Sequence, residues 1–178
     1  IIFIFIVALF LRLLMVGVWY AMDQGERLSA DADIYIGLAE SLMAGQGFQL
    51  DGVPSLRRPP LYPFFIGLFL KVRPFPIGVY IAQAFLGAFS CVLLYFLGRV
   101  MFGEKAGLLA AALFSVYYLD VRQTVMVLPK ILFVFFLLLH FCFLMSAQSR
   151  GSSSAYVGSG VAAGLMLLAK EVAVFYIP

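Results

Sequence analysis

Apolar runs long enough to cross a lipid bilayer constrain this chain more than any other feature of its sequence. Three such runs cover residues 1–20, 77–100 and 125–147. A helix needs about 20 mostly apolar residues to span the hydrocarbon core of a bilayer. The sequence therefore predicts several helices that cross a membrane, with one charge, on Arg12, inside the first of them.

The overall composition agrees with this interpretation. Hydrophobic residues make up 64% of the 178 residues and charged residues only 12%, and the mean hydropathy is +1.06. Soluble domains contain roughly 45–50% apolar and about 25% charged residues. The net charge of +3 is small and scattered, which argues against a nucleic-acid partner. A lipid bilayer is the expected surrounding of the chain.

Two shorter apolar runs, 104–120 and 155–177, complete the pattern. We therefore expect an all-α polytopic integral membrane protein with about five transmembrane helices, in which residues 1–178 form the N-terminal part of one membrane domain. The first connection, 21–76, is long, and we place it on the outer face, although Lys and Arg are nearly balanced between the two sides. Both ends of the chain look cut, so we expect a longer protein.

The first connection holds most of the side chains capable of chemistry. It contains six of the nine acidic residues, which are Asp23, Glu26, Asp31, Asp33, Glu40 and Asp51. The apolar positions of an amphipathic helix occur at Ile34, Tyr35, Leu38, Ala39 and Leu42. Gly45 and Gly47 would stop that helix. It is too short to span a bilayer, so we expect it to lie in the membrane interface.

Two interpretations of the acidic residues at the start of this helix stay open. Asp31 and Asp33 would serve as ordinary helix caps, because carboxylates accept hydrogen bonds from the first backbone N–H groups and oppose the helix dipole. They would also suit catalysis, since a carboxylate can take a proton from an attacking hydroxyl.

A pair of arginines precedes two prolines further along the same connection. Pro59 and Pro60 stiffen the chain, so Arg57 and Arg58 stand on a semi-rigid corner near the membrane surface. Arginine recognises phosphate through several N–H groups at once. The alternative is that the two side chains only anchor the connection to lipid headgroups. A second short apolar helix is expected over 61–70.

The sequence predicts no metal site. Cys91 and Cys142 both lie in apolar runs, where cysteine behaves as a small hydrophobe. His140 has no second ligand nearby in the sequence, and we interpret it as a packed, hydrogen-bonded helix residue. No cofactor is assigned, although a requirement for a divalent cation stays open.

Taken in order, the polar residues of the first connection resemble a known family. Asp31 stands four residues before Tyr35, a Leu-Ala pair and a Gly-x-Gly follow, and Arg58 then precedes two prolines. This pattern is similar to that of the GT-C membrane glycosyltransferases, specifically the bacterial relatives of the dolichyl-phosphate-mannose protein mannosyltransferases and the lipid A aminoarabinose transferases. Gln83 and 86–88 in the second apolar run also resemble the family.

The resemblance implies a function. Such enzymes move a sugar from a polyprenyl-phosphate carrier to a lipid, glycan or protein acceptor on the outer face of the inner (plasma) membrane, with inversion at the anomeric carbon. It implies that Asp31, with Asp33 as a substitute, is the general base or the group that orients the acceptor. Arg58, with Arg57 beside it, would bind the carrier phosphate, and Tyr35 would lie at the substrate. The active site would face the periplasm or the exterior, and this stretch alone would be inactive.

The fourth apolar run departs from the family pattern. Relatives often carry an acidic residue before a Leu-Phe pair there, but this chain has Lys130 before Leu132 and Phe133. Lys130 would bind phosphate, or would only extend its charge to the interface. Asp120 is the candidate for the missing carboxylate. Arg12 would either pair with another helix or contact the carrier.

Two other functions stay open from the sequence. A transporter or flippase of lipid-linked intermediates would place charges at the membrane midplane and often shows repeated halves. Here the charges gather in one connection and no repeat is visible. A non-catalytic scaffold related to the enzymes would account for the departure at Lys130.

Overall fold

The computed structural model describes residues 1–22, 30–55, 58–73 and 75–172. Its helices are α1 (Ile2–Ala21), α2 (Ala30–Met43), α3 (Leu61–Gly67), α4 (Ile77–Phe102), α5 (Glu104–Ser115), α6 (Tyr118–Gln123), α7 (Lys130–Arg150) and α8 (Ser153–Ala169). Within the described residues the one sheet is an antiparallel hairpin of β1 (Gln49–Leu50) and β2 (Val53–Pro54), which the sequence did not predict. The fold is all-α, as predicted.

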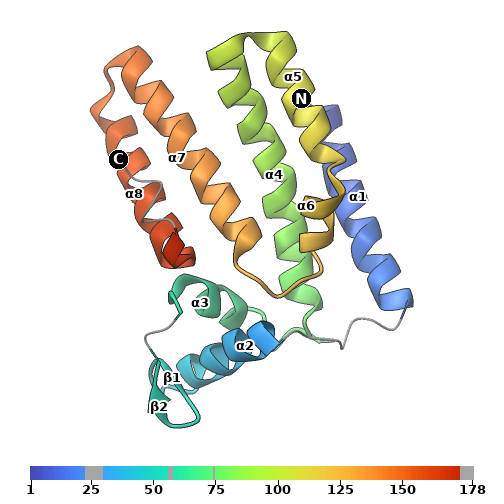
Figure 1. Ribbon diagram of the computed structural model, residues 1–178, viewed down its shortest axis with the longest axis vertical. Coiled ribbons are helices and arrows are strands. Elements are labelled where there is room, and N and C mark those ends of the chain that lie inside the picture. Colours follow the sequence, from blue (N-terminus) through green and yellow to red (C-terminus); the bar gives the residue numbers. More distant parts are fainter. Residues whose placement is uncertain (23–29, 56–57, 74, 173–178) are drawn as a thin grey trace.

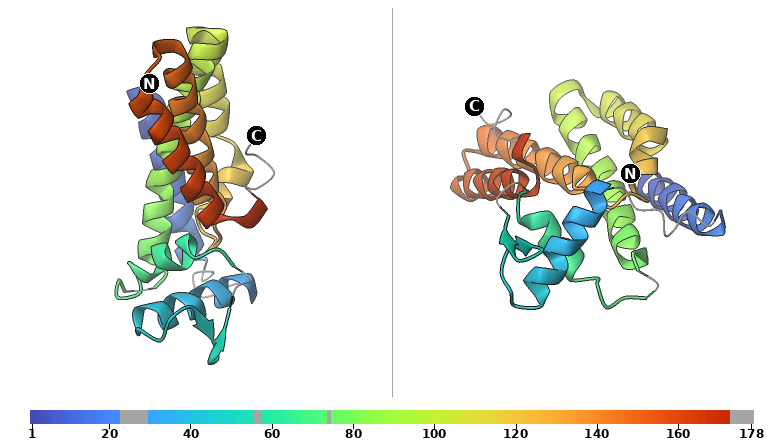
Figure 2. Two further views of the ribbon diagram at one scale, coloured as in Figure 1. Left: turned by 90° about the vertical axis from the view of Figure 1, so that its left-hand side faces the viewer. Right: turned by 60° about the horizontal axis from the view of Figure 1, so that its bottom comes forward.

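The long helices form a bundle with a cap at one end. α1, α4, α5, α7 and α8 run side by side along the long axis (Figure 1), and the view turned by 90° shows the same alignment (Figure 2). The helices α2 and α3 and the hairpin gather where α1 stops and α4 starts, and we call them the end cap. The short turns at Gly103 and at 151–152 lie at the opposite end.

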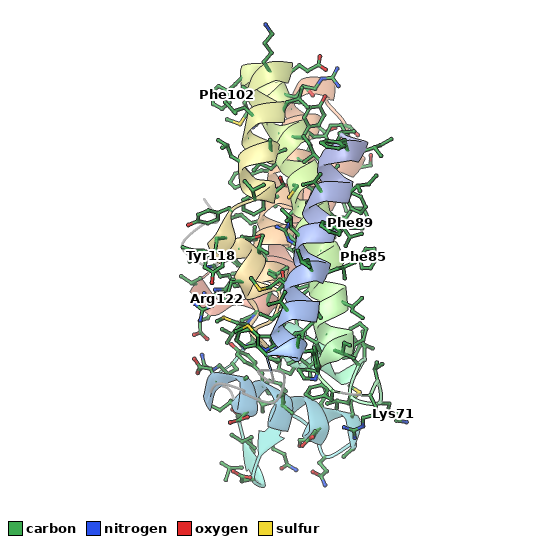
Figure 3. The ribbon with its side chains drawn as sticks, turned by 90° about the vertical axis from the view of Figure 1, so that its right-hand side faces the viewer. Lys71, Phe85, Phe89, Phe102, Tyr118 and Arg122 are labelled. Carbon is green, nitrogen blue, oxygen red and sulfur yellow. The ribbon has the colours of Figure 1, made fainter. Side chains whose placement is uncertain are left out.

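The sides of the bundle are apolar. Phe85 and Phe89 project outward from α4, Phe102 lies at the end away from the cap, and Lys71 lies at the level of the cap (Figure 3). Phe85 and Phe89 are 42% and 49% exposed. A soluble protein rarely leaves a large continuous apolar surface open to water, whereas lipid tails cover it at no cost.

Among the residues that the structure describes, three helices are long and apolar enough to cross a membrane. These helices cover Ile2–Ala21, Ile77–Phe102 and Lys130–Ser149. They match the first, second and fourth predicted spans, and they support the polytopic membrane fold that the sequence indicates.

The third predicted span, 104–120, is broken in two. α5 ends at Ser115 and α6 starts at Tyr118. The Ser115 hydroxyl donates a hydrogen bond to the Ala112 carbonyl at 2.7 Å. Such bonding of a hydroxyl to the preceding turn competes with the backbone ladder and bends helices.

The fifth predicted span, 155–177, is helical only as far as Ala169. Lys170 is extended, with φ −154° and ψ 128°, and residues 173–178 lie outside the described residues. A longer helix would carry the adjacent charges of Lys170 and Glu171 onward in an apolar segment, which is costly. The helix therefore stops where the charges begin.

Glycines bring α4 and α5 into close contact. A Cβ on Gly107 would lie 2.6 Å from the Tyr95 carbonyl oxygen, and one on Gly98 would lie 2.9 Å from the Gly107 Cα. No larger side chain fits at either position without moving the helices apart. Small residues serve the same purpose at many helix contacts in membranes.

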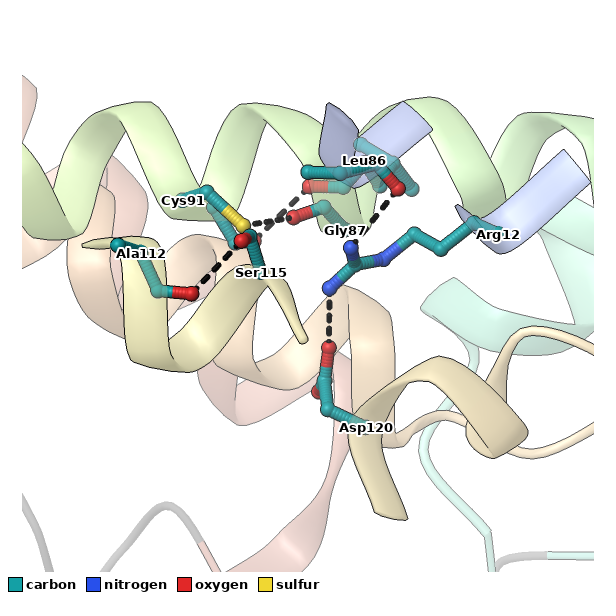
Figure 4. Close-up of polar contacts among 9 residues, drawn as sticks. Arg12, Leu86, Gly87, Cys91, Ala112, Ser115 and Asp120 are labelled. Carbon is teal, nitrogen blue, oxygen red and sulfur yellow. Dashed lines mark hydrogen bonds and ion pairs between the residues drawn. The ribbon is translucent and has the colours of Figure 1, made fainter. Parts of the chain in front are cut away.

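A buried ion pair joins α1 to α6. Arg12 Nη2 donates to Asp120 Oδ2 at 2.6 Å, and Arg12 is fully buried. Its Nη1 donates to the Ala8 carbonyl at 3.1 Å, and α4 leaves room for the guanidinium at Gly87, where a Cβ would collide with Arg12 Nε (Figure 4). Of the two roles considered for Arg12, the structure thus shows the pairing inside the bundle.

We expect Asp120→Asn to destabilise the protein by about 3–5 kcal/mol, because it leaves the Arg12 charge buried without a counter-charge. The double variant Arg12→Met/Asp120→Leu should recover most of this loss, since both charges are removed. Thermal unfolding of the full-length protein in detergent measures both effects. Asp33→Asn, at an exposed position, is the matched control and should stay within ~0.5 kcal/mol of the parent. An Asp120→Asn protein as stable as the parent would contradict this account of the pair.

Candidate functional site

The helix α2 packs one face against α3 in the end cap. Its buried hydrophobic side chains are Ala32, Tyr35, Leu38 and Ala39. The sequence also placed Ile34 and Leu42 on this face, but both are only partly buried. Tyr35 lies within the buried face because the Tyr35 ring meets the Tyr62 ring of α3 edge-on. The ring centroids are 5.2 Å apart and the ring planes stand at 89°.

The hairpin lies against the middle of α2. Gly45 and Gly47 adopt φ values of 73° and 87°, a conformation that glycine reaches without strain, and α2 has ended before them as predicted. Leu50 of β1 then packs so closely on the helix that a Cβ on Gly37 would lie 2.7 Å from its Cδ1. This close approach fixes Leu50 beside the site.

Asp31 and Arg58, the two central residues of the predicted site, contact each other directly. Arg58 Nη2 donates to Asp31 Oδ1 at 2.5 Å, and their side chains are 28% and 58% exposed. Arg58 also lies over the Tyr35 ring, with its Cζ 5.4 Å from the ring centroid, as in a cation–π contact. The first turn of α2 thus supplies a carboxylate, and the proline corner before α3 supplies a cation beside it.

A pocket of about 420 Å³ adjoins Arg58, within the usual size range of small-ligand sites. The described residues that line it with Arg58 are Ile34, Leu50, Ser55 and Glu171. Glu171 follows the end of α8, which contacts α3 (Figure 1). Glu171 is not among the residues predicted for the site, because nothing in the sequence connects the end of the fifth apolar run with the first connection.

The pKa of the Tyr35 phenol responds to burial and to three charges. Burial raises the pKa of Tyr35, the positive charge of Arg58 lowers it, and the negative charges of Glu171 and Asp31 raise it. The net effect is upward, so the phenol is neutral at physiological pH and keeps its proton. A neutral phenol contacts Arg58 through its ring face and does not compete with a bound anion for the positive charge of Arg58.

Gln83 of α4 anchors the end cap to the bundle. Tyr62 of α3 donates a hydrogen bond to Gln83 Oε1 at 2.9 Å, and Gln83 Nε2 donates to the carbonyls of Thr124 and Met126, each at 2.9 Å. Tyr62 and Gln83 are both almost completely buried, and burial raises the pKa of Tyr62 well above its ordinary value. Gln83 was predicted only as part of the family resemblance, although an amide inside an apolar run is itself a signal of hydrogen-bonded polar groups.

The remaining predicted site residues do not join this group. Asp33 is exposed on α2, and Lys130 is exposed at the start of α7. Asp120, the candidate for the missing carboxylate, is bonded to Arg12 inside the bundle. Arg57 lies outside the described residues. The structure thus brings together Asp31, Arg58 and Tyr35 and adds Glu171.

Groups suited to binding a metal ion are not found in the described part of the chain. No three His, Cys, Asp or Glu side chains gather there. Cys91 and Cys142 are free thiols. His140 packs as the sequence analysis expected, with Nδ1 3.0 Å from both the hydroxyl and the carbonyl oxygen of Ser159 on the neighbouring helix α8.

At one end of the bundle of apolar helices, an acid and a cation lie beside a pocket of the size of small-ligand sites. Residues 57–178 match the family model of the dolichyl-phosphate-mannose-protein mannosyltransferases. The chain therefore belongs to this family, and its general class is that of the membrane glycosyltransferases. The matched range contains Arg58, Gln83 and Glu171 but begins after Asp31. No curated protein and no solved structure matches the sequence.

We expect Tyr62→Phe to loosen the end cap, because it leaves the buried Gln83 Oε1 without its donor, at a cost of about 1–3 kcal/mol. Hydrogen exchange at the α3 amides should become faster, and thermal unfolding should shift downward. Tyr117→Phe, at an exposed tyrosine between α5 and α6, is the matched control and should change neither. Unchanged exchange in α3 would show that Tyr62 does not hold the cap in place.

Proposed function

We propose that this chain belongs to an inverting glycosyltransferase that moves a sugar from a polyprenyl-phosphate carrier to an acceptor hydroxyl. The direct contact between Asp31 and Arg58 beside the 420 Å³ pocket carries the proposal. In this proposal Asp31 is the proton acceptor and Arg58 the phosphate-binding cation, and their contact supports the idea that both serve one substrate. The family match supports a glycosyltransferase, and the residues supply the roles.

Arg58 receives the phosphate of the carrier. A guanidinium has five N–H donors and matches phosphate oxygens well, and Nη2 bonds to Asp31 here. The Tyr35 ring supports the guanidinium from one face. In the reaction Arg58 neutralises negative charge that grows on the phosphate oxygen as its bond to the sugar breaks. Arg57 and Lys130 remain candidates for further phosphate contacts.

Asp31 acts as the general base. The acceptor hydroxyl attacks the anomeric carbon from the face opposite the phosphate and passes its proton to the carboxylate. One carbon–oxygen bond forms to the acceptor as the bond to the carrier phosphate breaks, and the polyprenyl phosphate leaves with the bonding electrons. Attack from the opposite face inverts the anomeric centre. For this step the carrier phosphate must replace Asp31 on Arg58, which frees the carboxylate.

The bilayer sets where this reaction takes place. The end cap lies at one end of the apolar helices (Figure 1), so its pocket stands at the lipid–water boundary, where a polyprenyl chain keeps its tail in lipid and its phosphate outside. We place this end at the outer face of the plasma membrane, toward the periplasm or the exterior. A lipid, glycan or protein acceptor would then approach from the aqueous side.

We expect Asp31→Asn to lower sugar transfer by the full-length enzyme at least about a hundredfold, because a general base contributes roughly 10²–10⁴-fold. Transfer is followed as release of polyprenyl phosphate from polyprenyl-phosphate-linked mannose in vesicles. Arg58→Gln should lose binding of polyprenyl phosphate, whereas Asp31→Asn should keep it. Glu40→Gln, at an exposed carboxylate later on α2, is the matched control and should retain activity. Full activity of Asp31→Asn would rule out this mechanism.

A further inference from the structure

One carboxylate at the pocket has no part in the reaction as proposed. Glu171 lines the same cavity as Arg58, together with Ser55, Leu50 and Ile34. Asp31 is bonded to Arg58 at 2.5 Å. Among the described residues that line the cavity, Glu171 is the one acidic side chain, and it stands on a different segment from the cation.

The end of α8 explains why Glu171 is there. The helix stops at Ala169, and Lys170 is extended with φ −154° and ψ 128°. The chain thereby leaves the helix axis at the end of the bundle that carries the cap, where α8 meets α3. The negative charge of Glu171 also reaches the Tyr35 phenol and raises its pKa, alongside the opposing effect of Arg58. Glu171 and Arg58 therefore act on the same small volume.

The chemistry of the pocket defines what Glu171 would bind. A single oxygen links the sugar to the phosphate, so a phosphate on Arg58 places the sugar in the adjoining cavity. Sugar hydroxyls donate hydrogen bonds, and an ionised carboxylate only accepts them. Hydrogen bonds to a charged acceptor are about twice as strong as those between neutral groups. Leu50 and Ile34 offer apolar surface to the C–H faces of the ring.

We infer that Glu171 determines specificity by accepting a hydrogen bond from a hydroxyl of the donor sugar and by repelling a sugar that carries its own carboxylate. The inference rests on the proposed function, because it takes Arg58 as the phosphate site. It adds a contact to the sugar itself, from a segment outside the first connection.

Binding to the full-length protein in detergent micelles tests this inference with three probes. They are polyprenyl phosphate, polyprenyl-phosphate-linked mannose and polyprenyl-phosphate-linked glucuronic acid. Glu171→Gln should weaken binding of the mannose-linked carrier about tenfold, a loss of about 1.4 kcal/mol, and should strengthen binding of the glucuronic acid-linked carrier. Binding of polyprenyl phosphate should not change. Glu171→Asp, which keeps the charge, should recover part of the loss.

The controls separate the failure of this inference from the failure of the proposed function. Glu104→Gln, at the exposed first residue of α5, which starts at the end of the bundle away from the cap, should bind all three probes as the parent does. Unchanged binding of both sugar-linked carriers by Glu171→Gln overturns the inference while Arg58 remains the phosphate site. Equal weakening of all three probes overturns it as well, because Glu171 would then support the fold and not the sugar. If the parent protein fails to bind polyprenyl phosphate, the proposed function fails with it.

Discussion

The hydrogen bonds of Gln83 hold the end cap to the bundle, and the geometry of the candidate site depends on them. The side-chain amide accepts from Tyr62 of α3 and donates to two carbonyls of the segment between α6 and α7. Inside an apolar bundle each of these groups would be costly to leave without a partner. The network therefore favours one arrangement of α3 on α4. Only two prolines separate Arg58 from the start of α3. Fixing α3 therefore also fixes the direction from which Arg58 reaches Asp31.

The chain contains two arginine–aspartate pairs that differ in their surroundings. Arg12 and Asp120 are both buried, with further support from the Ala8 carbonyl, so neither can leave without stranding the other. Asp31 and Arg58 are partly exposed and lie beside a cavity. Breaking a partly exposed pair of this kind costs little, because water can solvate both charges and an anion can take the place of Asp31 on Arg58. The same pair of residue types thus joins two helices inside the bundle in one place and lies partly exposed beside a pocket in the other.

The sequence predicted the elements whose signal is local. Long apolar runs predicted α1, α4 and α7, and the spacing of apolar residues before two glycines predicted α2. The pattern from Asp31 to Arg58 predicted which residues would meet. The break before α6 and the early end of α8 were not predicted. The first depends on the hydroxyl of Ser115 and the second on the charges after Ala169, and these few groups change the mean apolar character of each run very little. Asp120, the partner of Arg12, and Arg58, which lines the same pocket as Glu171, are also far away in the sequence from these residues, and no local pattern points to them.

The meeting of Glu171 with the first connection follows from the alternation of helix directions. α1 runs to the cap and α4 leaves it, α5 and α6 together return to it, α7 leaves it, and α8 returns (Figure 1). The first connection, the segment 124–129 and residues 170–172 therefore share one end of the bundle. The break between α5 and α6 does not alter this order, because both pieces run in the same direction. Charged side chains from separate segments can thus gather at the lipid–water boundary without entering the apolar interior. A charge inside the bundle requires a buried partner, as Arg12 has in Asp120.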